Sequence, residues 1–115
     1  MDTVYYLPGC DTCRKILASL PPHSLEMRDI KKQPLTALEV DALKALSGSY
    51  EALFSRQSQQ YKALGLKDKQ LSESDYRQHL LEHYTFLKRP VFVIGKQIYI
   101  GNKPDNVARV VAALS

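Results

Sequence analysis

Apolar and polar positions along the first third of the chain predict a strand, a helix and a second strand. The segment TVYYL (3–7) is rich in β-branched and aromatic residues, which is typical of a strand. A helix should follow from about Asp11, because apolar residues recur at helical spacing over 16–20, and two prolines at 21–22 should end it. The alternation in HSLEMRDI (23–30) predicts an exposed or edge strand. Two strands joined through a helix usually pair in parallel.

The middle of the chain predicts helices. Thr36 and Glu39 have the spacing of a capping box and should begin the first of them, which the sequence SGS should end. The apolar face of this helix should comprise Leu35, Leu38, Ala42, Leu43 and Leu46. The segments YEALFSR (50–56), QSQQYKALGL (57–66) and LSESDYRQHLLEHY (71–84) predict three further helices.

The last third of the chain predicts a hairpin and a final helix. The apolar runs VFVI (91–94) and QIYI (97–100) flank a Gly-Lys turn. The segment 102–114 then predicts a helix whose apolar face comprises Val107, Val110, Val111 and Leu114. The chain order is therefore βαβ, a helical insertion and ββα. This order predicts an α/β fold with a mixed four-stranded sheet and helices on its faces.

Length, composition and charge are those of one soluble globular domain. The chain has 115 residues, of which 44% are hydrophobic and 24% charged. It contains no apolar run long enough to span a bilayer, and its N-terminus does not have the pattern of a signal peptide, so we expect a cytoplasmic protein without a membrane. The net charge of +4 is spread along the chain, which favours a solvated surface over direct nucleic-acid binding.

The chain has two cysteines, Cys10 and Cys13, in one CxxC motif. Cys10 follows the first predicted strand and precedes the first predicted helix, and a helix N-terminus stabilises a thiolate, so its pKa should fall toward neutrality. Cys13 comes about one helical turn later and could attack a mixed disulfide formed on Cys10. This predicts Cys10 as the nucleophile and Cys13 as the resolving thiol. Two alternatives remain open: a pair of packed, inert cysteines, or part of a zinc site with His23 as a third ligand and a dimer supplying the rest.

Three blocks of the sequence together resemble the arsenate reductase (ArsC)/Spx family of thioredoxin-fold proteins. They are YYLPGCDTCRK (5–15), LFSRQSQQYKALGL (53–66) and LKRPVFVIGKQIYIGNKPDNV (87–107), in the family's order and spacing. The resemblance implies a single thioredoxin-like domain over 1–115, with a βαβ–ββα core and a helical insertion at approximately 35–86.

The resemblance also implies roles for individual residues. Cys10 matches the nucleophilic cysteine of the family, and Cys13 matches the second cysteine of the Spx-type CxxC. Arg56 and Arg89 stand where the family places oxyanion-binding arginines, and Arg89 is thereby expected to take part in catalysis. Lys103 stands where glutaredoxin-linked arsenate reductases carry a third arginine. A lysine keeps the positive charge of that arginine but loses the planar guanidinium that donates two parallel hydrogen bonds.

Several further positions complete the expected site. Pro90 opens a strand, and the resemblance implies a cis bond before it that leaves backbone groups free to pair with substrate. Arg14 lies in the first turn beside the cysteines, where it could tune them or point outward. The HNP sequence that precedes the arsenate reductase cysteine is replaced by YLP. His79 and His83 lack the HExxH pattern of a zinc protease, so we expect surface histidines and no metal.

Two functions compete at this point. The first is a thiol-dependent oxidoreductase that reduces an arsenate-like oxyanion or a disulfide, needs no bound cofactor, and is reset by thioredoxin or by glutathione with glutaredoxin. The second, implied by the Spx resemblance, is a redox-sensing regulator that binds the C-terminal domain of the RNA polymerase α subunit. Gly48 matches an interface glycine of Spx, but the chain lacks the long C-terminal extension of Spx, which favours the enzyme.

Overall fold

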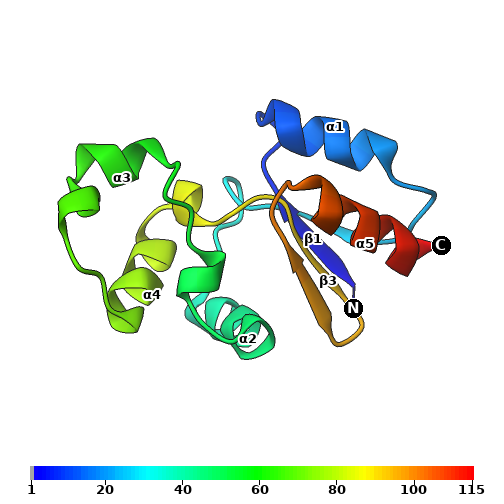
Figure 1. The fold of residues 1–115 in the computed structure, drawn as a ribbon. Coiled ribbons are helices and arrows are strands. Elements are labelled where there is room, and N and C mark those ends of the chain that lie inside the picture. The colour runs from blue at the N-terminus through cyan, green and yellow to red at the C-terminus, as the bar shows by residue number, and fades with distance from the viewer. Residues whose placement is uncertain (1) are drawn as a thin grey trace. The chain divides into compact units, whose positions relative to one another are not determined.

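The computed structural model describes residues 2–115 and divides the chain into two compact units. The sheet unit comprises the chain up to Gln33 together with Arg89–Ser115, and the helical unit comprises Pro34–Lys88 (Figure 1). The helical unit therefore begins and ends within two residues of the segment 35–86 that was predicted as an insertion. None of the described helices is both long and apolar enough to span a bilayer.

The sheet unit contains a mixed four-stranded sheet in the order β2-β1-β3-β4. The central strand β1 (Thr3–Tyr6) pairs in parallel with β2 (Glu26–Asp29) and antiparallel with β3 (Val91–Ile94). The strand β4 (Gln97–Ile100) completes the hairpin with β3. The predicted fold class, the hairpin and the edge position of the second strand are thus confirmed.

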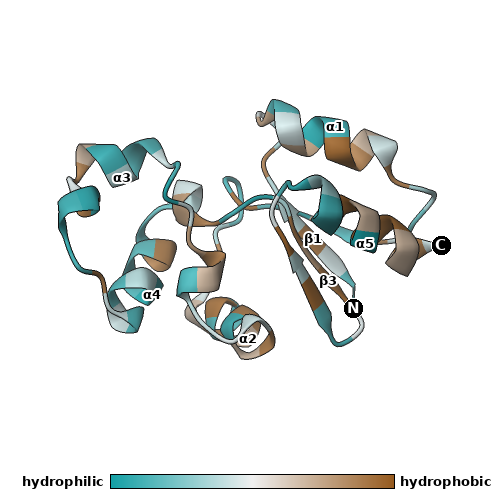
Figure 2. Cartoon of the chain, in the orientation of Figure 1, coloured by the Kyte–Doolittle hydropathy of each residue, from teal (hydrophilic) through white to brown (hydrophobic). Residues whose placement is uncertain are grey.

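One core forms between the sheet and two helices, α1 (Asp11–Ser19) and α5 (Pro104–Leu114), which lie on the same side of the sheet (Figure 1). Its buried members are Val4, Ile16, Leu25, Phe92 and Val110. Figure 2 shows apolar residues concentrated along β3. Apolar burial of this kind is the main driving force for folding, so the core fixes both helices against the sheet that carries the cysteine loop.

The helical unit is built around two capped helices, α2 (Ala37–Ser47) and α4 (Glu73–Glu82). Each begins with a capping box, at Thr36 and Ser72 respectively, so backbone N–H groups at both helix starts have side-chain acceptors. The helix α2 ends at Gly48, whose φ of 91° lies in the left-handed region that glycine adopts without a steric penalty.

The helix predicted over 50–56 is wrong, because only the 3-10 turn η1 (Glu51–Leu53) forms before Phe54 leaves helical geometry to bridge Leu87 and to bury its side chain completely. The helix predicted within 57–66 is confirmed as the short α3 (Gln59–Ala63). Two further 3-10 turns are η2 (Leu66–Asp68) and η3 (Tyr84–Phe86).

The predicted apolar face of α2 is only partly confirmed. Leu43 is buried as predicted, but Leu38 is 83% exposed and Leu46 is 40% exposed, and the buried Val40 was not predicted. Apolar residues occupy more than one face of this helix, and local periodicity does not determine which face packs against neighbouring elements.

An aromatic cluster forms the centre of the helical unit. Phe54 stacks on Phe86 with 5.1 Å between ring centroids and lies 4.9 Å from the ring of Tyr76. His79 packs 5.2 Å from Phe86, and the Nδ1 of His83 accepts a hydrogen bond from the backbone of η3. Both histidines are partly buried by this cluster, so the prediction that they are surface residues is wrong.

A partly exposed ion pair links α2 to α4. The Arg77 guanidinium donates to both carboxylate oxygens of Asp41, at 2.8 and 3.1 Å, and the Tyr50 hydroxyl donates to the same carboxylate at 2.7 Å. These hydrogen bonds, first that of Arg77 and then that of Tyr50, lower the pKa of Asp41 to about 2.

Candidate active site

The sheet topology brings most of the predicted site residues to one edge of the sheet unit. Strands β1 and β4 end at this edge and β3 begins there, because β3 runs antiparallel to both neighbours. Cys10 follows β1, Arg89 and Pro90 precede β3, and Lys103 follows β4. The backbone N–H of Gly101 donates to the carbonyl of Pro90 at 2.9 Å, which joins two of these segments directly. The candidate site is therefore the end of the sheet where these segments meet, which we call the cysteine edge.

Cys10 is the N-cap residue of α1. A turn through Pro8 and Gly9 is closed by the Cys10 N–H, which donates to the carbonyl of Leu7 at 3.1 Å. The Cys10 carbonyl accepts the first helical bond, from Arg14 N–H at 3.0 Å. The thiol itself makes no cap hydrogen bond and remains partly exposed, so it is available to a reactant at the helix N-terminus.

Opposing effects act on the pKa of Cys10. Partial burial raises it, but the nearby backbone N–H and thiol of Cys13, the positive charge of Arg89 and the nearby N–H of Thr12 together lower it below its ordinary value. These donors lie in the first turn of α1, where N–H groups have no helical partner. The local fold therefore favours the thiolate at this sulfur.

Cys13 has the opposite character. Its side chain is completely buried against the sheet unit, and both cysteines are free thiols. Burial, reinforced by the hydrogen bond to Cys10 and by the Cys10 charge, raises the pKa of Cys13 to about 11, although the Leu7 N–H opposes this shift. The pair therefore consists of an accessible sulfur that favours ionisation and a buried neighbour that stays protonated.

Arg89 and Pro90 form the segment that enters β3. The peptide bond between them is cis, which confirms the expectation drawn from the family resemblance. Pro90 is fully buried, and the charge of Arg89 acts directly on both cysteines. The catalytic role of Arg89 and the substrate-binding role of both residues stay predictions.

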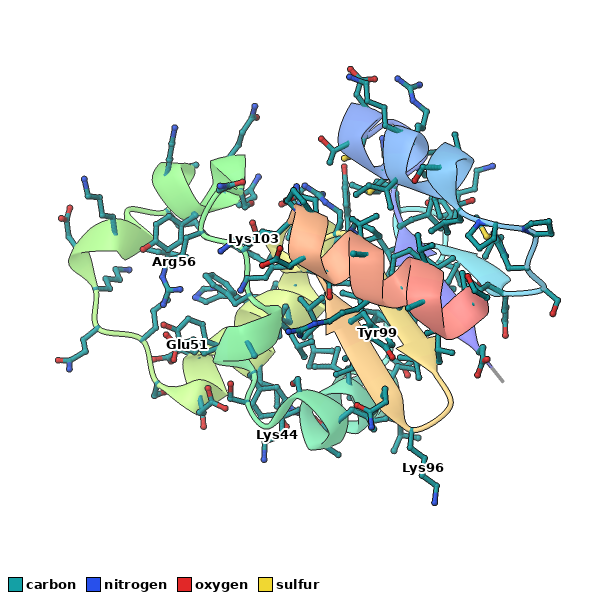
Figure 3. All side chains as sticks on the ribbon, turned by 45° about the vertical axis from the view of Figure 1, so that its right-hand side comes forward. Lys44, Glu51, Arg56, Lys96, Tyr99 and Lys103 are labelled. Carbon is teal, nitrogen blue, oxygen red and sulfur yellow. The ribbon has the colours of Figure 1, made fainter. Side chains whose placement is uncertain are left out.

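Lys103 is the N-cap residue of α5, which begins with Pro104 (Figure 3). Its side chain is exposed and makes no cap hydrogen bond. Its position at the cysteine edge fits an anion-binding lysine, a role that stays a prediction.

Arg14 is paired away from the cysteines. Its guanidinium donates to the Asp11 carboxylate on the exposed side of α1, and both side chains are mostly exposed. The side-chain charge that contributes to lowering the Cys10 pKa is that of Arg89. Of the two roles considered for Arg14, the structure favours the outward one.

Arg56 lies in the helical unit between η1 and α3. Its Nη2 donates to the Glu51 carboxylate and to the Tyr76 hydroxyl, each at 2.8 Å, and the guanidinium lies 5.7 Å from the centre of the Tyr76 ring. Figure 3 shows Arg56 and Glu51 with side chains that point toward one another. The oxyanion-binding role of Arg56 stays a prediction, and its two partners were not predicted.

Net charge is divided unequally between the two units. The sheet unit carries nine basic and five acidic residues, which accounts for the whole formal charge of +4, whereas the helical unit carries seven of each. The unit with the cysteines therefore has the positive potential that an anionic reactant requires.

The zinc alternative has no support in the described residues. Among residues 2–115, no three histidine, cysteine or carboxylate side chains are grouped so that they could hold a metal ion. His23, the third ligand of that alternative, accepts a hydrogen bond at Nδ1 from the Leu25 N–H at 3.2 Å.

Comparison with known proteins gives a consistent assignment. The model of the ArsC family matches residues 5–110. The uncharacterized protein YusI of Bacillus subtilis is 32% identical over 108 residues, which cover 90% of this chain and 92% of YusI. The global transcriptional regulator Spx of the same organism is 27% identical, over 95% of this chain and 86% of Spx. A solved arsenate reductase from Vibrio cholerae has a TM-score of 0.80 and 25% identity, over 95% of this chain and 96% of that one.

Proposed function

The chain belongs to the ArsC family, and on this premise we propose that it is a thiol-dependent oxidoreductase with Cys10 as nucleophile and Cys13 as resolving thiol. One observation carries the proposal: the two sulfurs are adjacent, and their environments lower the pKa of Cys10 while raising that of Cys13. A pair divided in this way separates attack from resolution, because the thiol with the lowered pKa ionises more readily and attacks first, while the other thiol stays protonated until it resolves the intermediate.

The preferred substrate is an arsenate-like oxyanion. The Cys10 thiolate attacks the pentavalent arsenic, and an oxygen leaves as water after protonation, which forms a sulfur–arsenic bond. The Cys13 thiol then loses its proton and attacks the Cys10 sulfur, so the sulfur–arsenic bond breaks and its electron pair stays on arsenic. The two thiols are thereby oxidised to one disulfide, arsenate is reduced to arsenite, and one water is released. The positive charge of the sheet unit supports an anionic substrate.

A disulfide substrate follows the same two attacks. Cys10 would displace one thiolate from the substrate and form a mixed disulfide, and Cys13 would displace the second. In both cases a dithiol protein such as thioredoxin, or glutathione with glutaredoxin, reduces the Cys10–Cys13 disulfide and is itself oxidised. The partly exposed Cys10 sulfur is the one that such a reductant reaches.

Positively charged and backbone groups bind the anion in this proposal. Arg89 stabilises the Cys10 thiolate and contacts the substrate, while Lys103 holds its oxygens. Arg56 is proposed as an oxyanion-binding residue of the helical unit. The backbone beside Pro90 offers pairing groups to the substrate.

Turnover and thiol labelling together test the proposal. The full chain is assayed with arsenate, and separately with glutathione disulfide, using each of the two reducing systems. We expect turnover with arsenate, its loss in Cys10→Ser, and accumulation of a Cys10–Cys13 disulfide when the reductant is omitted. Absence of turnover with both substrates and both reductants would refute the enzymatic proposal.

A redox-sensing regulator is the second candidate, because relatives over most of this chain are named global transcriptional regulators. In that case the same disulfide would control binding to the C-terminal domain of the RNA polymerase α subunit. Gly48 adds little support, since its positive φ at the end of α2 already calls for glycine.

The regulator is tested by binding of the purified α-subunit domain to the reduced and oxidised chain. Redox-dependent binding without turnover would replace the enzyme with the regulator. A binding affinity that is the same in both redox states, or too weak to measure, would eliminate this candidate.

A further inference from the structure

The Arg56 guanidinium is already occupied in the ligand-free helical unit. Glu51 and Tyr76 both accept hydrogen bonds from one nitrogen, Nη2, at 2.8 Å. Nε and Nη1 have no hydrogen-bond partner among residues 2–115. The guanidinium hydrogens that are already donated to these two partners therefore determine which hydrogen bonds Arg56 can offer to a ligand.

Both bidentate edges of an arginine side chain include Nη2. One edge pairs a hydrogen of Nη2 with the hydrogen of Nε, and the other pairs the second hydrogen of Nη2 with one hydrogen of Nη1, because the guanidinium is planar. Glu51 and Tyr76 take the two hydrogens of this shared nitrogen. An oxyanion can therefore accept two parallel hydrogen bonds from Arg56 only if Glu51 or Tyr76 first gives up its hydrogen bond to Nη2.

Tyr76 is the fixed partner. Its side chain is buried, its ring lies 4.9 Å from that of Phe54 in the aromatic cluster, and the guanidinium lies over the ring. Moving this hydroxyl would disturb the centre of the helical unit.

Glu51 is the partner that can leave. Its side chain is 53% exposed, and it extends from the short turn η1, so water can replace the contact to Arg56. The backbone of η1 stays in place without it, because the N–H groups of Tyr50 and Glu51 donate to the carboxylate of Glu73.

We infer that Glu51 is an internal competitor for an oxyanion at Arg56 within the helical unit: its carboxylate occupies the guanidinium in the free protein and is displaced when an oxyanion binds. This inference rests on the proposed function, in which Arg56 holds the oxyanion. Glu51 thereby raises the dissociation constant of every anion that binds Arg56. The effect excludes weakly binding or singly charged anions most strongly, because they compete poorly with a carboxylate that is already bound.

The test measures binding of inorganic arsenate by calorimetry in the full chain carrying Cys10→Ser, which prevents reaction. In this background Glu51→Gln keeps the shape of the side chain and removes its charge. We expect a two- to fivefold lower dissociation constant, in the range of an exposed ion pair. Glu51→Asp keeps the charge and should bind less tightly than Glu51→Gln.

Asp68→Asn is the matched control, because it removes one exposed negative charge from the same unit at η2. It should leave the dissociation constant within experimental error of the Cys10→Ser parent. If Asp68→Asn lowered the dissociation constant for arsenate as much as Glu51→Gln does, the inference would be overturned, because the change in net charge alone would then explain both results.

Arg56→Ala separates failure of the inference from failure of the function. If Arg56→Ala weakens arsenate binding and Glu51→Gln leaves it unchanged or weaker, competition by Glu51 is refuted while the oxyanion site stands. If Arg56→Ala has no effect, or if arsenate binds none of the variants, the proposed role of Arg56 fails and the inference fails with it.

Discussion

Cys10 and Cys13 lie near one another and shift each other's pKa in opposite directions: Cys13 lowers the pKa of Cys10, and Cys10 raises the pKa of Cys13. The proximity of the two side chains thus favours the charge on the more exposed sulfur. The disulfide proposed for the reaction would form between the two sulfur atoms, and it would remove the interaction that keeps the reduced pair asymmetric.

Alkylation should distinguish the two cysteines at neutral pH. Because burial raises the pKa of Cys13 to about 11 while the pKa of Cys10 is lowered, the thiolate population at pH 7 is larger at Cys10. Iodoacetamide labelling followed by peptide mass analysis should modify Cys10 first. In Cys13→Ala, which lacks the thiol donor, the midpoint of the Cys10 labelling profile should move to higher pH. Equal labelling rates in the wild type would contradict the assignment.

Removal of the Arg89 charge should make Cys10 harder to ionise. In Arg89→Gln the pKa of Cys10 rises, because a favourable charge is lost, and arsenate turnover at pH 7 should fall about tenfold or more. Rates of labelling and turnover against pH measure both effects. Arg109→Gln is the control, since it removes an exposed charge from α5 in the same unit and should change neither profile. Matching profiles for Arg89→Gln and the wild type would contradict the role given to Arg89.

Acid should weaken the helical unit through Asp41. Because the folded pKa of about 2 lies below the unfolded value of about 3.9, the contribution of Asp41 to stability is complete above pH 4 and is lost as pH falls through 2. Urea unfolding followed by circular dichroism between pH 2 and pH 5 measures this loss. In Asp41→Asn the free energy of unfolding should be lower at pH 5 and should depend less on pH in this window. An unchanged pH dependence would show that Asp41 is not coupled to folding.

Two leucines of α2 should respond differently to truncation. Leu43→Ala should lower the free energy of unfolding by about 2–5 kcal/mol, because Leu43 is buried and its loss leaves a cavity. Leu38→Ala removes the same atoms from a side chain that is 83% exposed and should change stability by no more than about 0.5 kcal/mol. Chemical denaturation of both variants measures the difference. Similar losses of unfolding free energy in the two variants would contradict the packing of α2 through the face that contains Leu43.

The elements that the sequence predicts well are those set by neighbouring residues. The hairpin strands and the capping box at Thr36 agree with the structure because turn residues and cap side chains act within a few positions. The face of α2 and the short turn at η1 depend on distant partners, such as Leu87 for Phe54. Periodicity over a short window carries no information about such contacts.

The same distinction applies to the candidate site. Cys10 and Cys13 could be predicted from spacing alone, since a CxxC at a strand–helix junction places both sulfurs in one turn. The pairing of Arg56 with Tyr76 spans twenty positions and depends on how α4 packs in the helical unit, so no local pattern predicts it. The assignment of Arg89 came from the family resemblance, and the structure adds its charge acting on Cys10.

The direction of the strands has a practical consequence for handling the protein. Because β1 runs toward the cysteine edge and α5 runs away from it, Asp2 and Ser115 both lie at the far end of the sheet unit, where the Gly95 N–H donates to Asp2 Oδ1 at 2.9 Å (Figure 1). An affinity tag, a dye or a sensor surface attached at either terminus therefore leaves the reactive sulfur open to solution.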